Sequence, residues 1–251
     1  MVDFVGAGCG AADLITLRGK RLIEEADVII YAGSLVNPEL LGFAKESCEV
    51  HNSAYMDLDQ VISVMVKAEA DGKKIVRLHT DDPSVYGAIR EQMDRLDKLG
   101  IDYNVCPGVS SFCGAAAALK AEYTLPEVSQ TVIITRMAGR TPVPEKESIE
   151  SLAAHHATMV IFLSTGMLKE LSERLISGGY SPDSPAAIVY KASWKDEKIM
   201  RCTVAQLAET AEKNGIRKTA LITVGDFLGD DYALSKLYDK TFETEFRKAE
   251  K

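Results

Sequence analysis

Short runs of branched apolar residues alternate along this chain with longer segments whose apolar positions recur every three or four residues. Residues 58–72 and 86–100 show this helical spacing, and each segment ends at a glycine, as many helices do. The short apolar runs predict strands, which span residues 2–8, 27–33, 74–80, 102–108, 130–136, 157–164, 186–193 and 219–227. The alternation predicts an α/β fold.

A change of pattern near the middle of the chain predicts a domain boundary. Residues 109–121 read as a helix rich in small side chains, and the stretch 122–130 separates this helix from the next apolar run. We therefore predict an N-terminal α/β domain over residues 1–120 and a C-terminal α/β domain over residues 121–251.

Composition and charge narrow the class of protein. The chain has 46% hydrophobic and 26% charged residues, as a soluble globular protein does. With 37 acidic against 29 basic side chains and a net charge of -8, we do not expect a nucleic-acid partner. The sequence shows no apolar run of membrane-spanning length and no signal peptide, so we expect a cytoplasmic protein without a membrane partner.

The cysteines and histidines do not predict a metal site. The five cysteines form no CxxC pair, and the histidine pair at positions 155 and 156 lacks the spacing of a zinc motif. Buried thiols and solvated imidazoles are the favoured interpretation, and we assign no metal.

Three loops that follow predicted strands carry the residues most suited to chemistry. The first, VGAGCGAA, fits G-x-G-x-x-A through Gly6, Gly8 and Ala11, a turn that lets the backbone approach a phosphate. The second, TDDPSVYG, places Asp82 at the N-cap and Pro83 at the first position of a predicted helix. The third is CPGVSS at residues 106–111. Because such loops meet at one edge of a parallel sheet, together they predict a ligand site.

These loops, in this order, resemble those of the tetrapyrrole methylases. The segments VGAGCGAADLITLRG, TDDPSVYG and CPGVSSFCGAAAAL carry the resemblance, which extends over essentially the whole chain. It implies a two-domain tetrapyrrole methylase fold with a cofactor cleft between the domains, S-adenosylmethionine as cofactor, a tetrapyrrole substrate and a homodimer. YAGSLVNPELL, HNSAYMDLDQVI and SQTVIITRMAGRTPVPEKE are most similar to the branch that methylates C11 of precorrin-4 or cobalt-precorrin-4 in cobalamin biosynthesis.

The resemblance also suggests roles for particular residues. The positions that align with the family's cofactor loops are Cys9, Thr80, Asp81, Asp82, Val85, Ser110, Ser111, Leu163 and Ala192. The candidates for proton removal are Tyr31, Tyr55, Tyr86 and His79. Arg136 and Arg140, in TRMAGRTP next to a predicted loop, are the candidate cationic partners of the substrate's carboxylates.

Two positions depart from the family pattern and leave other functions open. Tyr31 is followed by Ala32, where the related uroporphyrinogen methylases have a carboxylate, which argues against uroporphyrinogen as substrate. Asp81 stands where the family has glycine, so a side chain and a charge lie where backbone is expected to approach the cofactor. The alternatives are a nicotinamide-dependent oxidoreductase and a tetrapyrrole-binding protein with weakened methylase activity.

Overall fold

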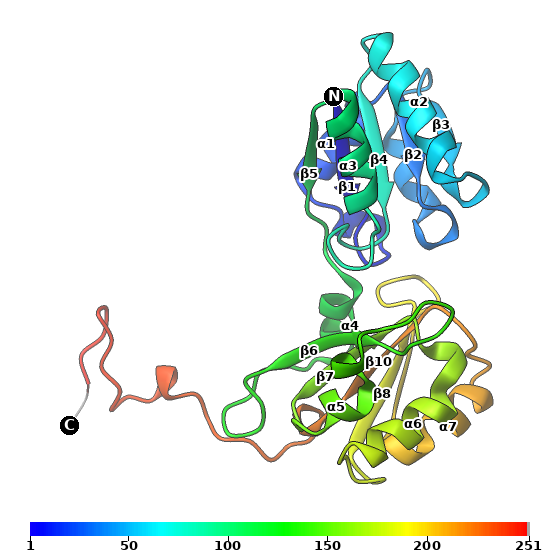
Figure 1. Cartoon of the computed structure of the whole chain (residues 1–251). Coiled ribbons are helices and arrows are strands. Elements are labelled where there is room, and N and C mark those ends of the chain that lie inside the picture. Colours follow the sequence, from blue (N-terminus) through cyan, green and yellow to red (C-terminus); the bar gives the residue numbers. More distant parts are fainter. Residues whose placement is uncertain (250–251) are drawn as a thin grey trace. The chain divides into compact units, whose positions relative to one another are not determined.

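The computed structural model describes residues 1–249, which form two compact units (Figure 1). Unit 1 comprises Met1–Ala115 and Lys191–Glu197, and unit 2 comprises Ala116–Tyr190 and the chain from Lys198 onward. The units differ from the predicted domains in two ways: helix α4 (Ser111–Leu119) is shared between them, and Lys191–Glu197 belongs to unit 1. The domain boundary at residue 120 stays a prediction.

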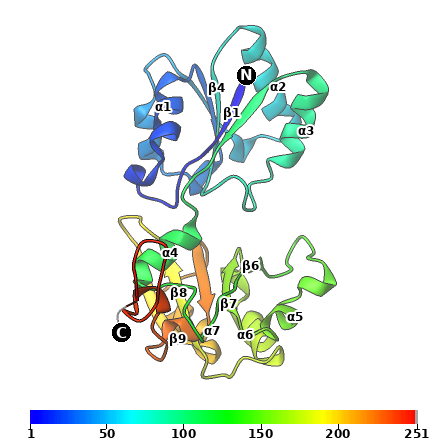
Figure 2. The ribbon, with the colours of Figure 1, turned by 90° about the vertical axis from the view of Figure 1, so that its left-hand side faces the viewer.

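Unit 1 is built on a five-stranded parallel sheet with the order β3-β2-β4-β1-β5. The strands are β1 (Val2–Gly6), β2 (Val28–Tyr31), β3 (Glu49–Asn52), β4 (Ile75–His79) and β5 (Tyr103–Cys106). The α-helices are α1 (Leu17–Glu25), α2 (Leu58–Ala70), α3 (Arg90–Leu99) and α4. Figure 2 shows α1 on one side of the sheet and α2 and α3 on the other.

The alternation of side chains along the central strands of unit 1 gives the sheet two apolar faces. Phe4 and Ile30 pack with Met65 of α2 on one face, and their neighbours Val5 and Ile29 pack on the other. Because both faces are covered, the carboxyl edge of the sheet is left to the loops, as is usual in α/β folds.

Unit 2 contains a mixed five-stranded sheet with the order β6-β7-β10-β8-β9. Strands β6 (Val132–Arg136) and β7 (Thr158–Phe162) are parallel, whereas β8 (Pro185–Tyr190), β9 (Lys198–Thr203) and β10 (Ala220–Val224) pair in antiparallel fashion. Helices α5 (Ile149–Ala153), α6 (Leu168–Ser177) and α7 (Leu207–Lys213) complete the core of unit 2.

Short 3-10 helices join these elements. They are η1 (Ala12–Leu14), η2 (Gly33–Leu35), η3 (Pro38–Phe43), η4 (Ser53–Tyr55), η5 (Glu145–Glu147), η6 (Thr165–Met167), η7 (Val204–Gln206), η8 (Asp226–Leu228) and η9 (Lys236–Tyr238). None of the helices within residues 1–249 has the length and the apolar character that a membrane span requires.

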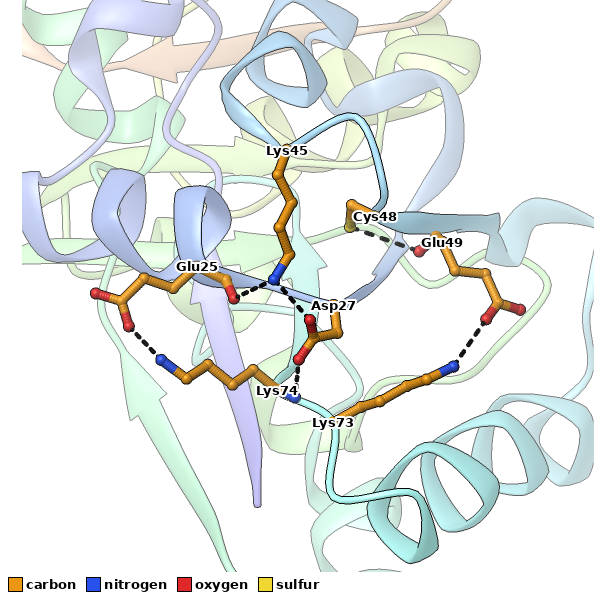
Figure 3. A network of polar contacts seen from close by, with 7 residues as sticks. All are labelled: Glu25, Asp27, Lys45, Cys48, Glu49, Lys73 and Lys74. Atoms are coloured by element: carbon orange, nitrogen blue, oxygen red, sulfur yellow. Dashed lines mark hydrogen bonds and ion pairs between the residues drawn. The ribbon is translucent and has the colours of Figure 1, made fainter.

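A polar network ties together the amino ends of β2, β3 and β4 (Figure 3). Asp27 Oδ2 accepts a hydrogen bond from the backbone N–H of Lys74 at 2.8 Å, and its Oδ1 lies 2.6 Å from Lys45 Nζ. The other members are Glu25, Cys48, Glu49 and Lys73. Since the strands are parallel, this network lies at the amino edge of the sheet, whereas the loops that follow the strands lie at the carboxyl edge.

Candidate functional site

The loops after β1 and β4 pair directly with each other at the carboxyl edge of the unit 1 sheet. The N–H of Ala7 donates to the carbonyl of His79 at 2.7 Å. Gly8 and Asp81 then exchange two backbone hydrogen bonds, of 3.3 and 3.2 Å, which form an isolated antiparallel bridge. The loops that the sequence singled out therefore form one cluster rather than separate turns.

The loop after β5 joins this cluster through two glycines in backbone contact. A Cβ on Gly108 would lie 2.3 Å from the carbonyl oxygen of Asp81 and 2.8 Å from the Cα of Gly6. A Cβ on Gly6 would lie 2.6 Å from the carbonyl oxygen of Asp81 and 2.6 Å from the Cα of Gly108. Such distances are far below van der Waals contact, so Gly6 and Gly108 permit the loops to pack against one another.

Asp82 fixes the distance between the second and third loops. Its Oδ2 accepts from the N–H of Gly108 at 2.9 Å, and its Oδ1 accepts from the N–H of Ser84 at 2.8 Å. Burial raises the pKa of this carboxyl, but the hydrogen bonds from Ser84 and Gly108 outweigh that effect, and the pKa lies below its ordinary value. The carboxylate is therefore charged at neutral pH and holds the two loops together.

The predicted helix start at Pro83 is wrong. Residues 83–86 form a turn, and α3 begins only at Arg90. Tyr86 and Ala88 adopt positive φ values of 57° and 50°, which are incompatible with a continuous helix. Asp82 thus caps a turn through Ser84 instead of capping a helix.

Asp81 adopts the left-handed conformation expected at a position where the family has glycine. Its φ is 55°, and its Oδ2 accepts a hydrogen bond from Ser111 Oγ at 2.8 Å. Burial raises the pKa of Asp81 to about 6, although the hydrogen bonds from Ser111 act in the opposite direction. The charge of Asp81 therefore changes within the range of ordinary assay buffers.

The segment Lys191–Glu197 packs against the first loop, a contact that the sequence does not predict. Ser193 Oγ accepts from the N–H of Ala11 at 3.0 Å and lies 3.3 Å from Cys9 Sγ. A Cβ on Gly10 would lie 2.2 Å from Cδ1 of Trp194. The sequence around Ser193 carries no recognisable motif, so only the tertiary structure shows that it supports the first loop.

Most of the predicted cofactor residues lie in this cluster of unit 1. They are Cys9, Thr80, Asp81, Asp82, Val85, Ser110, Ser111 and Ala192, carried by the three loops, the turn after Asp82 and the segment Lys191–Glu197. Leu163 belongs to unit 2, where it follows β7 with a φ of 53° and is 65% exposed. No group of His, Cys, Asp and Glu side chains suited to a metal ion occurs within residues 1–249.

The four candidates for proton removal lie at or just beyond the carboxyl ends of β2, β3 and β4. Tyr31 ends β2, Tyr55 lies in η4 after β3, and Tyr86 lies in the turn after β4. His79 is buried against Phe4, with ring centroids 6.0 Å apart. Burial, reinforced by the charge of Arg77, lowers the pKa of His79 to about 3, so this imidazole is neutral at physiological pH and better suited to packing than to proton transfer.

The two candidate substrate-binding arginines lie in unit 2 and differ from each other. The guanidinium of Arg136 donates to the carbonyls of Met137, Thr141 and Pro142 at 2.8 to 3.2 Å. Arg140 lies in the loop that Arg136 organises, and it is exposed. Arg136 therefore holds the loop in position, whereas Arg140 is exposed to solvent.

Comparison with known proteins identifies the family. The family model for tetrapyrrole (corrin/porphyrin) methylases matches residues 1–208. The chain belongs to the tetrapyrrole methylase family. The family membership predicted from the three loops is therefore confirmed, and with it the use of S-adenosylmethionine as methyl donor.

Individual tetrapyrrole methylases are similar over nearly the full chain. The cobalt-precorrin-4 C(11)-methyltransferase of Methanocaldococcus jannaschii is 59% identical, with 100% of this chain and 97% of the relative covered. The solved structure of a cobalt precorrin-4 methyltransferase of cobalamin biosynthesis has a TM-score of 0.89 at 46% identity, covering 91% of this chain and 96% of that one. The two-domain α/β methylase fold is thus confirmed.

A third relative carries a ligand. The structure of uroporphyrin-III C-methyl transferase from Thermus thermophilus, complexed with S-adenyl homocysteine, has a TM-score of 0.73 at 25% identity and covers 90% of this chain and 92% of that one. This complex has a similar fold, although its sequence identity to the chain is much lower than that of the precorrin-4 methyltransferases.

Proposed function

We propose that this chain is an S-adenosylmethionine-dependent methyltransferase that acts on C11 of precorrin-4 or cobalt-precorrin-4 in cobalamin biosynthesis. The observation that carries the proposal is the 59% identity to a cobalt-precorrin-4 C(11)-methyltransferase over the whole chain. The absence of a carboxylate after Tyr31, where the uroporphyrinogen branch has one, supports the same choice of substrate.

The residues of the loop cluster suit the proposed cofactor. Within residues 1–249, Ser110 Oγ is buried without a hydrogen-bond partner, so it can serve a bound ligand. Asp82 and Ser111 add polar groups at the same edge of the sheet, and Asp81 would contribute its backbone. We assign the cofactor site in unit 1 to these residues with Cys9, Thr80, Val85 and Ala192, and Leu163 stays a predicted contact.

Positioning is the main task of these residues. S-adenosylmethionine, when bound, supplies an electrophilic methyl group on a sulfonium, and the electron-rich tetrapyrrole carbon is the nucleophile. The interlocked loops provide a rigid support, which favours an aligned approach at about 3 to 3.5 Å. Tyr31, Tyr55 and Tyr86 are the proposed groups for the proton that leaves or shifts afterwards, and the neutral, buried His79 ranks below them.

Two measurements test the proposal and its rivals. Incubation with precorrin-4 or cobalt-precorrin-4 and S-adenosylmethionine is expected to release one equivalent of S-adenosylhomocysteine per methylated ring. Calorimetric titration is expected to show binding of S-adenosylhomocysteine and none of NAD, since β2 ends without the acid that holds a nicotinamide ribose. Binding of NAD alone would support the oxidoreductase, and tight tetrapyrrole binding without turnover would support the weakened methylase.

Substrate capture is expected to depend on Arg140 directly and on Arg136 through the loop. Replacing both with Ala removes one exposed cation and three carbonyl contacts, so the KM for the tetrapyrrole should rise about tenfold or more while the affinity for S-adenosylhomocysteine stays the same. Steady-state kinetics of the double variant and of Arg217→Ala, a control from another loop of unit 2, measure this effect. An unchanged KM in the double variant would contradict the assignment.

We propose that the protein is cytoplasmic and forms a homodimer. This expectation comes from the family resemblance. Sedimentation equilibrium at micromolar concentration is expected to give twice the chain mass of 27.3 kDa, and a monomer would contradict the expectation.

A further inference from the structure

A buried arginine lies at the centre of the unit 1 sheet without an acidic partner. Arg77, on β4, is only 6% exposed and forms no ion pair with any residue from 1 to 249. Its Nη1 donates to the carbonyl of Ile30 at 3.1 Å, and its Nε donates to Gln92 Oε1 at 3.0 Å. Burial lowers the pKa of Arg77 to about 10, so the side chain remains charged at neutral pH. Stability alone would favour an apolar residue at this position.

Gln92 connects this arginine to the chain beyond β4. Gln92 lies in the first part of α3 and is 6% exposed. A guanidinium only donates hydrogen bonds, so Gln92 must turn its oxygen toward Arg77 and its NH₂ group away. That NH₂ group donates to the carbonyl of Ala88 at 3.1 Å. The arginine therefore sets the orientation of the amide, and the amide holds Ala88.

The segment that Gln92 holds is a turn of unfavourable backbone conformation. We use the name 83–89 turn for the turn 83–86 together with residues 87–89, which lead to α3. In the 83–89 turn, Tyr86 and Ala88 have positive φ, and a Cβ on Gly87 would lie 2.2 Å from the carbonyl oxygen of Pro83. Such conformations persist only where the surroundings maintain them. At its start the turn is held by Asp82, which binds Gly108 and Ser84, and Gln92 holds its other end.

We propose that Arg77 and Gln92 are positioning residues that hold the 83–89 turn in the shape required to bind S-adenosylmethionine. The inference rests on the proposed function, because the turn directly follows the cofactor residues 80–82 and carries Val85 and Tyr86. Neither Arg77 nor Gln92 has to contact the cofactor for this role. Both act through the carbonyl of Ala88, which fixes where the turn ends.

The variant Gln92→Glu separates positioning from stability. A carboxylate still accepts from Arg77 and gains an ion pair, but it cannot donate to Ala88 and repels that carbonyl. We expect the melting temperature of the unliganded protein to be unchanged or higher, whereas the Kd for S-adenosylhomocysteine rises about five- to tenfold. Gln92→Met, which loses both contacts, is expected to lower the melting temperature and to raise the Kd at least as much.

Ile222→Val is the matched control, because Ile222 lies on β10 and is fully buried in the core of unit 2, whereas the 83–89 turn belongs to unit 1. It should lower the melting temperature and leave the Kd within about twofold of the wild type. A Kd for Gln92→Glu no higher than that of Ile222→Val would overturn the inference while the proposed function stands. Failure of the wild-type chain to bind S-adenosylhomocysteine would overturn both.

Discussion

Replacing Gly108 with Ala is expected to abolish cofactor binding. The added Cβ would lie 2.3 Å from the carbonyl oxygen of Asp81 and 2.8 Å from the Cα of Gly6, and both are backbone atoms that cannot rotate away. The loops after β1, β4 and β5 must therefore separate, which is expected to cost about 3 kcal/mol or more. We expect the melting temperature to fall by about 6 to 12 °C and the affinity for S-adenosylhomocysteine to fall by more than about 100-fold.

Gly42→Ala is the matched control for Gly108→Ala. A Cβ on Gly42, near the end of η3, would meet nothing within 4 Å. Its melting temperature and its affinity should equal those of the wild type. Binding of S-adenosylhomocysteine by Gly108→Ala with wild-type affinity, measured by calorimetry, would show that the contact between the loops is not needed for the site.

Replacing Asp81 with Gly is expected to stabilise the unliganded protein at high pH and to tighten cofactor binding. Burial raises the folded-state pKa of Asp81 to about 6, above the ordinary value of 3.8. The folded protein therefore holds a proton that the unfolded chain has lost, and stability falls as the pH rises through this range. Glycine removes this cost and the strain of a φ of 55°. We expect the melting temperature to rise by about 2 to 6 °C at pH 8.

Asp81→Asn separates the effect of charge from that of backbone strain. Asparagine keeps a side chain that tolerates positive φ but carries no charge. Its stabilisation relative to the wild type should be present at pH 8 and absent near pH 4, where Asp81 is protonated in the folded protein. Calorimetry is expected to show tighter binding of S-adenosylhomocysteine by Asp81→Gly, more so at pH 8 than at pH 5.5. Equal or weaker affinity would mean that the Asp81 carboxylate is a ligand.

The fold was predictable from the sequence because its signals are local. Runs such as 74–80 and 157–164 contain consecutive large apolar residues, and β4 and β7 within them are buried along their whole length, as is typical of the central strands of a covered sheet. Glycine at position 100 ends α3 with a φ of 66°, as the spacing predicts. The three loops could also be found, because glycines and acids directly after apolar runs mark the ligand edge of an α/β sheet.

The contacts that support the loops were not predictable, because they join residues far apart in the chain. Ser193 binds the N–H of Ala11 across 182 positions, and its immediate neighbours in sequence give no sign of this role. Arg77 appears as a single charge in an apolar run, and only the structure shows that Ile30 and Gln92 satisfy it. The predicted helix start at Pro83 is wrong for a related reason, since Asp82 binds Gly108, a residue 26 positions away in the chain.

The position of the transferred methyl group tests the proposed function most directly. The chain would be incubated with precorrin-4 or cobalt-precorrin-4 and S-adenosylmethionine labelled with ¹³C in its methyl group, and the product examined by NMR. The proposed function predicts one labelled methyl group, attached to C11, with an equal amount of S-adenosylhomocysteine released. A label at any other ring position, or a tetrapyrrole recovered without label, would contradict it.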